Sequence, residues 1–174
     1  MTTHFDLKTA GFKPIWRYLV ILVALGFAAP SFAADLSVRI QNILSNEGKL
    51  RLALYSKDEY FPVLDDYQKP PAGVQAILVD PKPVNGEQVV VFKGLPPGRY
   101  AVAVHHNISG SGRNKRKPIT GMPIEPYGFT NNRWSLFSSP RFSDAAIEVG
   151  DKDVEHAIWV STHLSKVGGS TGNK

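Results

Sequence analysis

The chain has 174 residues, with 20 basic and 15 acidic side chains and a formal net charge of +5. It contains no cysteine, which excludes a disulfide framework, a thiol nucleophile, a thiolate metal site and a cysteine-linked lipid anchor. Its length is typical of a single domain that can bury an adequate core without covalent cross-links.

The N-terminal segment has the features of a cleavable signal peptide. Basic residues precede an apolar run over residues 18–29, which is too short to span a bilayer with a helix of about 20 residues. Pro30 breaks the run, and Ser31 and Ala33 then place small residues at the two positions that a signal peptidase reads. We expect residues 1–33 to be removed after Ala33 and the protein to reach the periplasm or the cell exterior. An uncleaved anchor helix is the alternative. The remaining chain would keep 17 basic and 14 acidic residues, a net charge of +3.

Alternation of apolar and polar residues predicts seven short strands after the signal segment. They cover residues 36–40, 50–54, 74–79, 88–92, 100–104, 145–149 and 156–164. The segment Ser45–Gly48 between the first two strands reads as a hairpin turn. This pattern predicts an all-β domain over residues 34–164, an antiparallel seven-stranded β-sandwich of the Greek-key, transthyretin or prealbumin-like kind.

The remaining segments are expected to contain little regular structure. Single helical turns are expected at residues 57–60 and 143–146, where an Asp or Ser side chain could cap them. The segment 165–174 is rich in Gly, Ser and Thr and is expected to be a disordered tail. The connection over residues 107–141 is unusually long for a compact domain. Because it is too apolar for disorder, we expect an ordered loop that folds back over one end of the sandwich.

A family resemblance appears around this connection. The residues Leu95–Val104 (LPPGRYAVAV), His106, and Gly121–Phe129 (GMPIEPYGF) followed by Asn131 and Asn132 resemble the bacterial domain-of-unknown-function family 2141. The resemblance extends over nearly the whole chain after residue 33. It implies an exported bacterial β domain and no particular activity.

The resemblance also implies a calcium-like loop after the histidine, with oxygen ligands at alternate positions. In this chain the matching positions Asn107, Ser109 and Ser111 carry neutral oxygens only, and Lys115 stands where the last carboxylate should be. A doubly charged cation needs carboxylates to offset its lost hydration. We therefore expect this degenerate loop to bind no metal, and we expect no cofactor.

A cluster of cations takes the place of those carboxylates. Arg113, Lys115, Arg116 and Lys117 lie within five residues. Export argues against nucleic acid, so the cations point to an anionic glycan, a phospholipid headgroup or an envelope protein. A hydrated loop without a ligand is the alternative.

His106 and Glu125, both near this loop, are candidates for acid/base catalysis. His105 and His106 should point to opposite faces of a strand, so they form a poor metal clamp. We expect His106 to face the core and to hydrogen-bond into the long loop. Glu125 could work with His106 as a general acid/base pair. It could instead accept hydrogen bonds from backbone N–H groups or from the imidazole. The second interpretation is favoured, because no nucleophile with an orienting base is apparent.

Aromatic residues in the loop allow two interpretations. Tyr127, Phe129, Trp134 and Phe137, with Asn131, Asn132 and Arg133 beside them, could stack on a sugar or could plug the open end of the sandwich. The plug is favoured, with a loop core of His106, Glu125, Tyr127, Phe129 and Asn131.

The hypotheses for function are a non-catalytic binding or accessory module, a hydrolytic enzyme using Glu125 and His106, or a purely structural domain. The sequence favours the binding module. We expect the protein to be a monomer.

Overall fold

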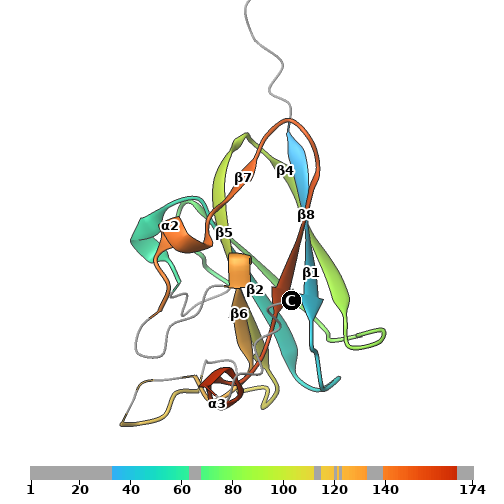
Figure 1. Cartoon of the computed structure of the whole chain (residues 1–174), viewed down its shortest axis with the longest axis vertical. Coiled ribbons are helices and arrows are strands. Elements are labelled where there is room, and N and C mark those ends of the chain that lie inside the picture. Colours follow the sequence, from blue (N-terminus) through green and yellow to red (C-terminus); the bar gives the residue numbers. More distant parts are fainter. Residues whose placement is uncertain are drawn as a thin grey trace, which may run out of the picture. The chain divides into compact units, whose positions relative to one another are not determined.

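The computed structural model of the chain describes residues 33–62, 68–111, 115–119, 121, 123–132 and 139–167. The strands of this part, drawn in Figure 1, are β1 (Ala34–Gln41), β2 (Lys49–Tyr55), β3 (Val74–Val79), β4 (Gln88–Leu95), β5 (Gly98–Asn107), β6 (Tyr127–Phe129), β7 (Ile147–Val149) and β8 (Val154–Trp159). The helical segments are η1 (Asp58–Tyr60), η2 (Thr130–Asn132), α2 (Phe142–Ala145) and α3 (His163–Val167). All of these elements belong to one compact unit, Phe32–Lys174.

The strands form two sheets. The first has the order β4-β1-β8, and the second has the order β3-β2-β5-β6, with β7 pairing the start of β5. The prediction of a mostly β domain is confirmed. Two of its details are wrong, because the described residues form eight strands and because β1 pairs with β8 in parallel. Alternation along a strand determines its two faces but carries no information about the direction of its neighbour.

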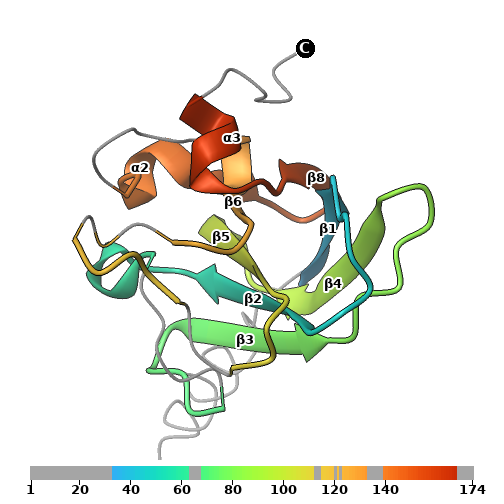
Figure 2. The same cartoon turned by 90° about the horizontal axis from the view of Figure 1, so that it is seen from below.

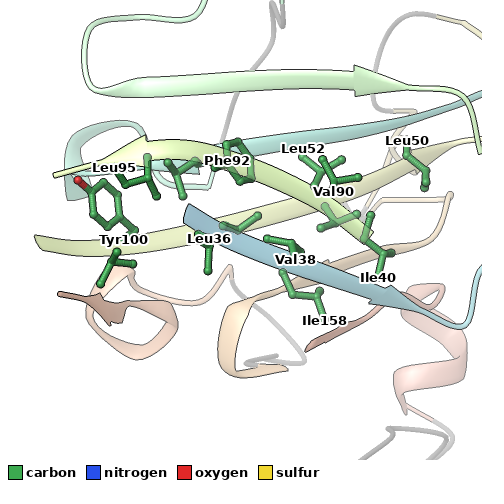
Figure 3. Close-up of a cluster of buried hydrophobic side chains, with 14 of the residues drawn as sticks. Leu36, Val38, Ile40, Leu50, Leu52, Val90, Phe92, Leu95, Tyr100 and Ile158 are labelled. Atoms are coloured by element: carbon green, nitrogen blue, oxygen red, sulfur yellow. The ribbon is translucent and has the colours of Figure 1, made fainter. Parts of the chain in front are cut away.

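The main core lies between the two sheets (Figure 3). Every second residue of β1 points into it, and so does every second residue of β2 and of β5, since successive side chains of a strand point to opposite faces. The fully buried members include Leu36, Val38, Ile40, Leu50, Leu52, Val102 and Ile158. Each such aliphatic side chain stabilises the fold by roughly 1.5–3 kcal/mol relative to an exposed position.

The outer face of the second sheet is covered as well. Tyr55 on β2 and Phe129 on β6 lie on this face, and Phe61 packs edge-on against both, with ring centroids 5.2 and 5.8 Å away. Phe142 of α2 is 6.0 Å from Phe61 in the same manner. As a result β2 is buried on both faces after Lys49, although its sequence alternates between apolar and partly polar residues.

The expected hairpin between the first two strands does not form. β1 pairs with β4 and β8, whereas β2 pairs with β3 and β5, so the segment Ser45–Gly48 connects the two sheets. Both strands still direct their apolar residues inward, but those residues meet across the core instead of lying side by side. The chain bends at residues 46–48, but the strand that follows the bend is not the partner of β1.

Several element boundaries differ from the prediction. β6 was not expected, and it places part of the long connection at the edge of the second sheet. The strand expected over residues 156–164 ends at Trp159, and α3 occupies His163–Val167. That helix includes the first residues of the tail that we expected to be disordered. Residues 168–174 lie outside the described part.

The two expected helical turns are confirmed as η1 and α2. The expected caps are wrong, because neither N-cap residue, Lys57 or Arg141, makes a side-chain capping hydrogen bond. In the described residues no helix is both long enough and apolar enough to cross a membrane.

Candidate functional site

The end of β5 sends two adjacent histidines to opposite faces of the second sheet. His106 faces the core and is 1% exposed. Its Nε2 lies 3.0 Å from the carbonyl oxygen of Glu47 and donates to it. The backbone N–H of His106 donates to the carbonyl of Pro126 at 2.9 Å. The side chain was expected to bond into the long connection. Instead it bonds to the turn between β1 and β2, and only the main chain reaches the connection.

His105 lies on the outer face, between Arg51 of β2 and Tyr127 of β6, which are its partners in register. It is buried, and neither ring nitrogen has a hydrogen-bond partner among the described residues. Burial lowers the pKa of His105 from 6.5 to about 3, and the positive charges of Arg51 and Arg116 act in the same direction. The ring is therefore neutral at physiological pH.

Tyr127 contacts two imidazole rings. Its ring is stacked with His105 at 6.2 Å and with His163 of α3 at 6.5 Å. The Tyr127 hydroxyl and His163 Nδ1 are 2.9 Å apart and share a hydrogen bond. Sequence reasoning missed His163, because we expected residue 163 to lie in a strand and α3 brings its ring to β6.

Glu125 ties the beginning of the long connection to the residues just before β6. The carboxylate is 7% exposed. Its Oε1 accepts from the backbone N–H of Ser109 at 2.8 Å, and its Oε2 accepts from Asn107 Nδ2 at 3.1 Å. The Glu125 carboxylate and the His106 ring form these hydrogen bonds with different partners, so the two groups are not a hydrogen-bonded acid/base pair. Glu125 accepts from a backbone N–H, as the second interpretation expects.

Replacing Glu125 by glutamine is expected to lower the free energy of unfolding by about 1–3 kcal/mol. Glutamine keeps one oxygen for Ser109 but turns a second donor toward the amide of Asn107. Urea denaturation measures the change. Glu148→Gln is the matched control, since the exposed Glu148 pairs only with the exposed Arg99 among the residues described, and it should cost less than about 1 kcal/mol. Equal midpoints for the two variants would contradict the role given to Glu125.

The calcium-like loop is held together by hydrogen bonds. Ser109 Oγ donates to Ser111 Oγ at 3.2 Å, and Asn107 Nδ2 is 3.4 Å from Ser111 Oγ. The Asn107 amide thus directs positive N–H dipoles at Glu125 and Ser111, where a cation would need free oxygen lone pairs. No group of three or more His, Cys, Asp or Glu side chains gathers anywhere in the described residues. One carboxylate that already accepts from protein donors does not fit a doubly charged cation.

The middle of the connection forms a short hairpin, which we call the basic hairpin (described residues 115–119, 121, 123 and 124). Ile124 N–H donates to the Lys115 carbonyl at 3.0 Å, and Gly121 N–H donates to the Lys117 carbonyl at 2.9 Å. Arg116 and Pro123 form an antiparallel bridge between these bonds. The ochre trace of this segment extends away from the two sheets in Figure 1, and Figure 2 shows it from below.

The predicted cations lie on this hairpin. Lys115, Arg116 and Lys117 are all exposed, and none of them forms a salt bridge with a residue that the structure describes. Arg116 Nη1 donates to the Gly121 carbonyl at 2.9 Å, which holds the guanidinium against the hairpin. Arg113 lies outside the described residues.

Two of the four aromatic residues of the predicted platform are described, and neither offers an exposed binding surface. Tyr127 and Phe129 are 7% and 8% exposed and pack on the outer face of the second sheet, so their ring faces are not open to a sugar. They also do not plug an end of the two sheets. Trp134, Phe137 and the neighbouring Arg133 lie outside the described residues.

The three residues after β6 form hydrogen bonds with neighbouring segments. The sequence analysis did not identify the first of them, Thr130. Thr130 is fully buried, and its hydroxyl accepts from Val102 N–H at 3.0 Å while donating to the Ala145 carbonyl. Asn131 is exposed, and its backbone N–H donates to His156 Nε2 at 2.9 Å. Asn132 accepts from Trp159 N–H at 2.8 Å. This segment joins β5, α2 and β8.

The protein is thus a β domain whose core lies between two sheets. The long connection after β5 carries a hydrogen-bonded hairpin with exposed cations. The chain belongs to the bacterial family described as "Uncharacterized protein conserved in bacteria (DUF2141)", whose model matches residues 38–157. This confirms the resemblance noted in the sequence.

Comparison with individual proteins adds little. No curated protein matches the chain. Two structures of the pilus-presented adhesin Spy0125 (Cpa) are similar at 12% and 10% identity, with TM-scores of 0.35 and 0.34. The matches cover 76% and 75% of this chain but only 27% and 28% of the adhesin chain. At these scores the likeness defines neither a shared fold nor a shared activity.

Proposed function

We propose that this protein is an exported, monomeric, non-catalytic binding module that contacts an anionic partner through the basic hairpin. The observation that carries the proposal is the set of three adjacent exposed cations, Lys115, Arg116 and Lys117, without an acidic partner in the described structure. Placement in the periplasm or outside the cell rests on the signal peptide expected from the sequence and is part of the proposal.

The hairpin is suited to contact because it is both exposed and anchored. The Glu125 carboxylate at its base is hydrogen-bonded to Ser109 and Asn107, and its two strands are joined by the bonds between Lys115 and Ile124 and between Lys117 and Gly121. A surface that is already ordered loses little conformational freedom on binding. Guanidinium and ammonium groups held together attract phosphate, sulfate or carboxylate groups of a partner.

A finer description of the fold is part of the same proposal. The chain crosses between the two sheets after β1, β3, β4 and β7. These repeated crossings support a Greek-key sandwich of the transthyretin-like kind.

Binding of dextran sulfate, a soluble polyanion, tests the proposal. Neutralising the hairpin by Lys115→Gln, Arg116→Gln and Lys117→Gln together is expected to weaken binding by about 3-fold to 150-fold, since each exposed ion pair contributes roughly 0.2–1 kcal/mol. Binding should also fall as salt rises, because exposed charges are screened over about 10 Å at 0.1 M. Fluorescence titration of the full chain measures both effects.

The matched control removes the same charge elsewhere. Lys57, Lys93 and Lys152 are exposed and have no salt bridge to a described residue. Their triple change to glutamine should leave the affinity within about twofold, because a change in net charge alone acts weakly at a distance. Equal losses in the two triple variants, or binding that does not respond to salt, would overturn the proposal.

A further inference from the structure

Pro118 and Ile119, the described residues at the tip of the basic hairpin, are apolar and exposed. Ile119 is 98% exposed, the highest fraction among the large apolar side chains that the structure describes. Ile124, at the foot of the hairpin, is 47% exposed. By contrast, Ile40 and Ile158 are fully buried.

Leu44 and Val84 are also exposed, at 82% and 72%, and a single exposed aliphatic side chain is ordinary on a protein surface. Ile119 differs from them in its place, because it lies on the basic hairpin just after three exposed cations.

The tip and the cations are arranged in order along the hairpin. Pro118 and Ile119 directly follow Lys115, Arg116 and Lys117 in the sequence. The hairpin therefore carries apolar residues at its tip and cations next to them. Part of the hairpin backbone is already paired, because the Lys117 carbonyl accepts from Gly121 N–H and the Gly121 carbonyl accepts from the Arg116 side chain. Pairing of this kind lowers the cost of moving a turn from water into a less polar medium.

The apolar tip distinguishes between the anionic partners that the cations allow. An acidic glycan offers carboxylates, sulfates and hydroxyls, and its sugar rings stack on aromatic faces. The described residues of the hairpin include no aromatic side chain, and Ile119 would have no partner on a glycan. An anionic bilayer offers phosphates at its surface and acyl chains about 5–10 Å below them. The hairpin presents groups for both layers.

We infer that the basic hairpin docks on an anionic phospholipid bilayer, with Ile119 inserted among the acyl chains and the three cations among the headgroup phosphates. This inference rests on the proposed function and names the anionic partner. Stable attachment to a bilayer generally takes an apolar insertion together with a basic patch. Each cation near an anionic surface contributes roughly a fivefold increase in affinity, and burial of one isoleucine contributes roughly tenfold or more.

The absence of cysteine in the sequence permits a direct test of insertion. An Ile119→Cys variant of the full chain is labelled with the environment-sensitive fluorophore NBD and mixed with vesicles. Blue-shifted emission is expected with phosphatidylcholine–phosphatidylglycerol vesicles and not with phosphatidylcholine alone. The control is Val89→Cys, on the exposed side of β4 at 47% exposure, and its label should not respond. An Ile119 label that stays in a polar environment on anionic vesicles, or equal shifts at both positions, would overturn the inference.

Affinity measurements separate this inference from the proposed function. Ile119→Ser is expected to weaken sedimentation with anionic vesicles about tenfold or more, and Val89→Ser should not change it. Every variant carries the same N-terminal segment, so differences between variants report on the hairpin. Both serine variants should bind dextran sulfate like the unmodified chain. If Ile119→Ser sediments unchanged while the neutralised triple variant loses dextran sulfate, the inference fails and the proposed function stands. If the unmodified chain binds neither probe, both fail.

Discussion

Replacing His105 by phenylalanine is expected to make the protein progressively more stable than the unmodified chain as the pH falls below 6.5. In the folded chain burial lowers the pKa of His105 to about 3, against an ordinary value of 6.5. Between these two pH values the unfolded chain binds a proton on this ring that the folded chain does not bind. Stability contributed by the neutral ring is therefore complete above pH 6.5 and is lost as the pH falls toward 3.

The size of the effect follows from the shift. One pKa unit corresponds to about 1.4 kcal/mol, so the unmodified chain should lose about 2 kcal/mol between pH 7 and pH 5, and in total about 5 kcal/mol below pH 3, through this group. Phenylalanine has a similar ring and can stack on Tyr127 in the same place. It removes no described hydrogen bond, because neither nitrogen of His105 has a partner in the described structure.

Denaturant unfolding of both proteins across the pH range measures the difference. Burial also lowers the pKa of His156, whose Nε2 accepts from Asn131 N–H. The folded chain therefore loses stability through His156 as well when the pH falls. His156 is present in both proteins, so its contribution cancels when the two free energies of unfolding are subtracted. A difference that stays constant between pH 7 and pH 5 would show that folding does not lower the pKa of His105.

Gly48→Ala is expected to destabilise the fold by more than about 3 kcal/mol or to prevent folding. Gly48 has a φ of +75°, and a Cβ at this position would lie 1.9 Å from the carbonyl oxygen of Asn107 and 2.7 Å from Ile108 Cα. Both are backbone atoms, so the turn between the sheets would have to move away from the end of β5. That movement would also pull the Glu47 carbonyl from the His106 ring.

Gly94→Ala separates the two contributions to this cost. Gly94 also has a positive φ, +65°, but a Cβ at this position would have no heavy atom within 4 Å beyond its chain neighbours. The change should therefore cost only about 1–2 kcal/mol for the left-handed backbone. Urea midpoints compare the two variants, and hydrogen exchange at Ser109 N–H reports whether the long connection loosens. Equal destabilisation by the two changes would mean that the Gly48 contact with β5 is unimportant.

Much of the local structure could be predicted from the sequence. The alternation along β5 correctly placed His106 toward the core and His105 on the opposite face. The helical turns at η1 and α2 and the family membership were also predicted. These are properties of neighbouring residues, so they can be recognised without knowing which segments meet.

The site was predicted only in part. The exposed cations could be read directly from Lys115 to Lys117, and Glu125 was identified as a residue of interest. Its hydrogen-bond partners were not, because Asn107 and Ser109 become its neighbours only when the connection returns to β5. The exposure of Ile119 was not predicted either, since the apolar character of the connection suggested that it folds back over the sandwich.

By itself the sequence determined which side chains of β1, β2 and β5 face the main core, because the two-residue period of a strand is a local property. The tertiary structure decided which strands lie side by side, and so placed β1 and β2 in different sheets and paired β1 with β8 in parallel. It also decided that Tyr127 contacts both His105 and His163 and that Glu125 does not pair with the His106 ring. These outcomes depend on contacts between residues far apart in the chain, whose free energy is set by how the two sheets pack and not by any short pattern.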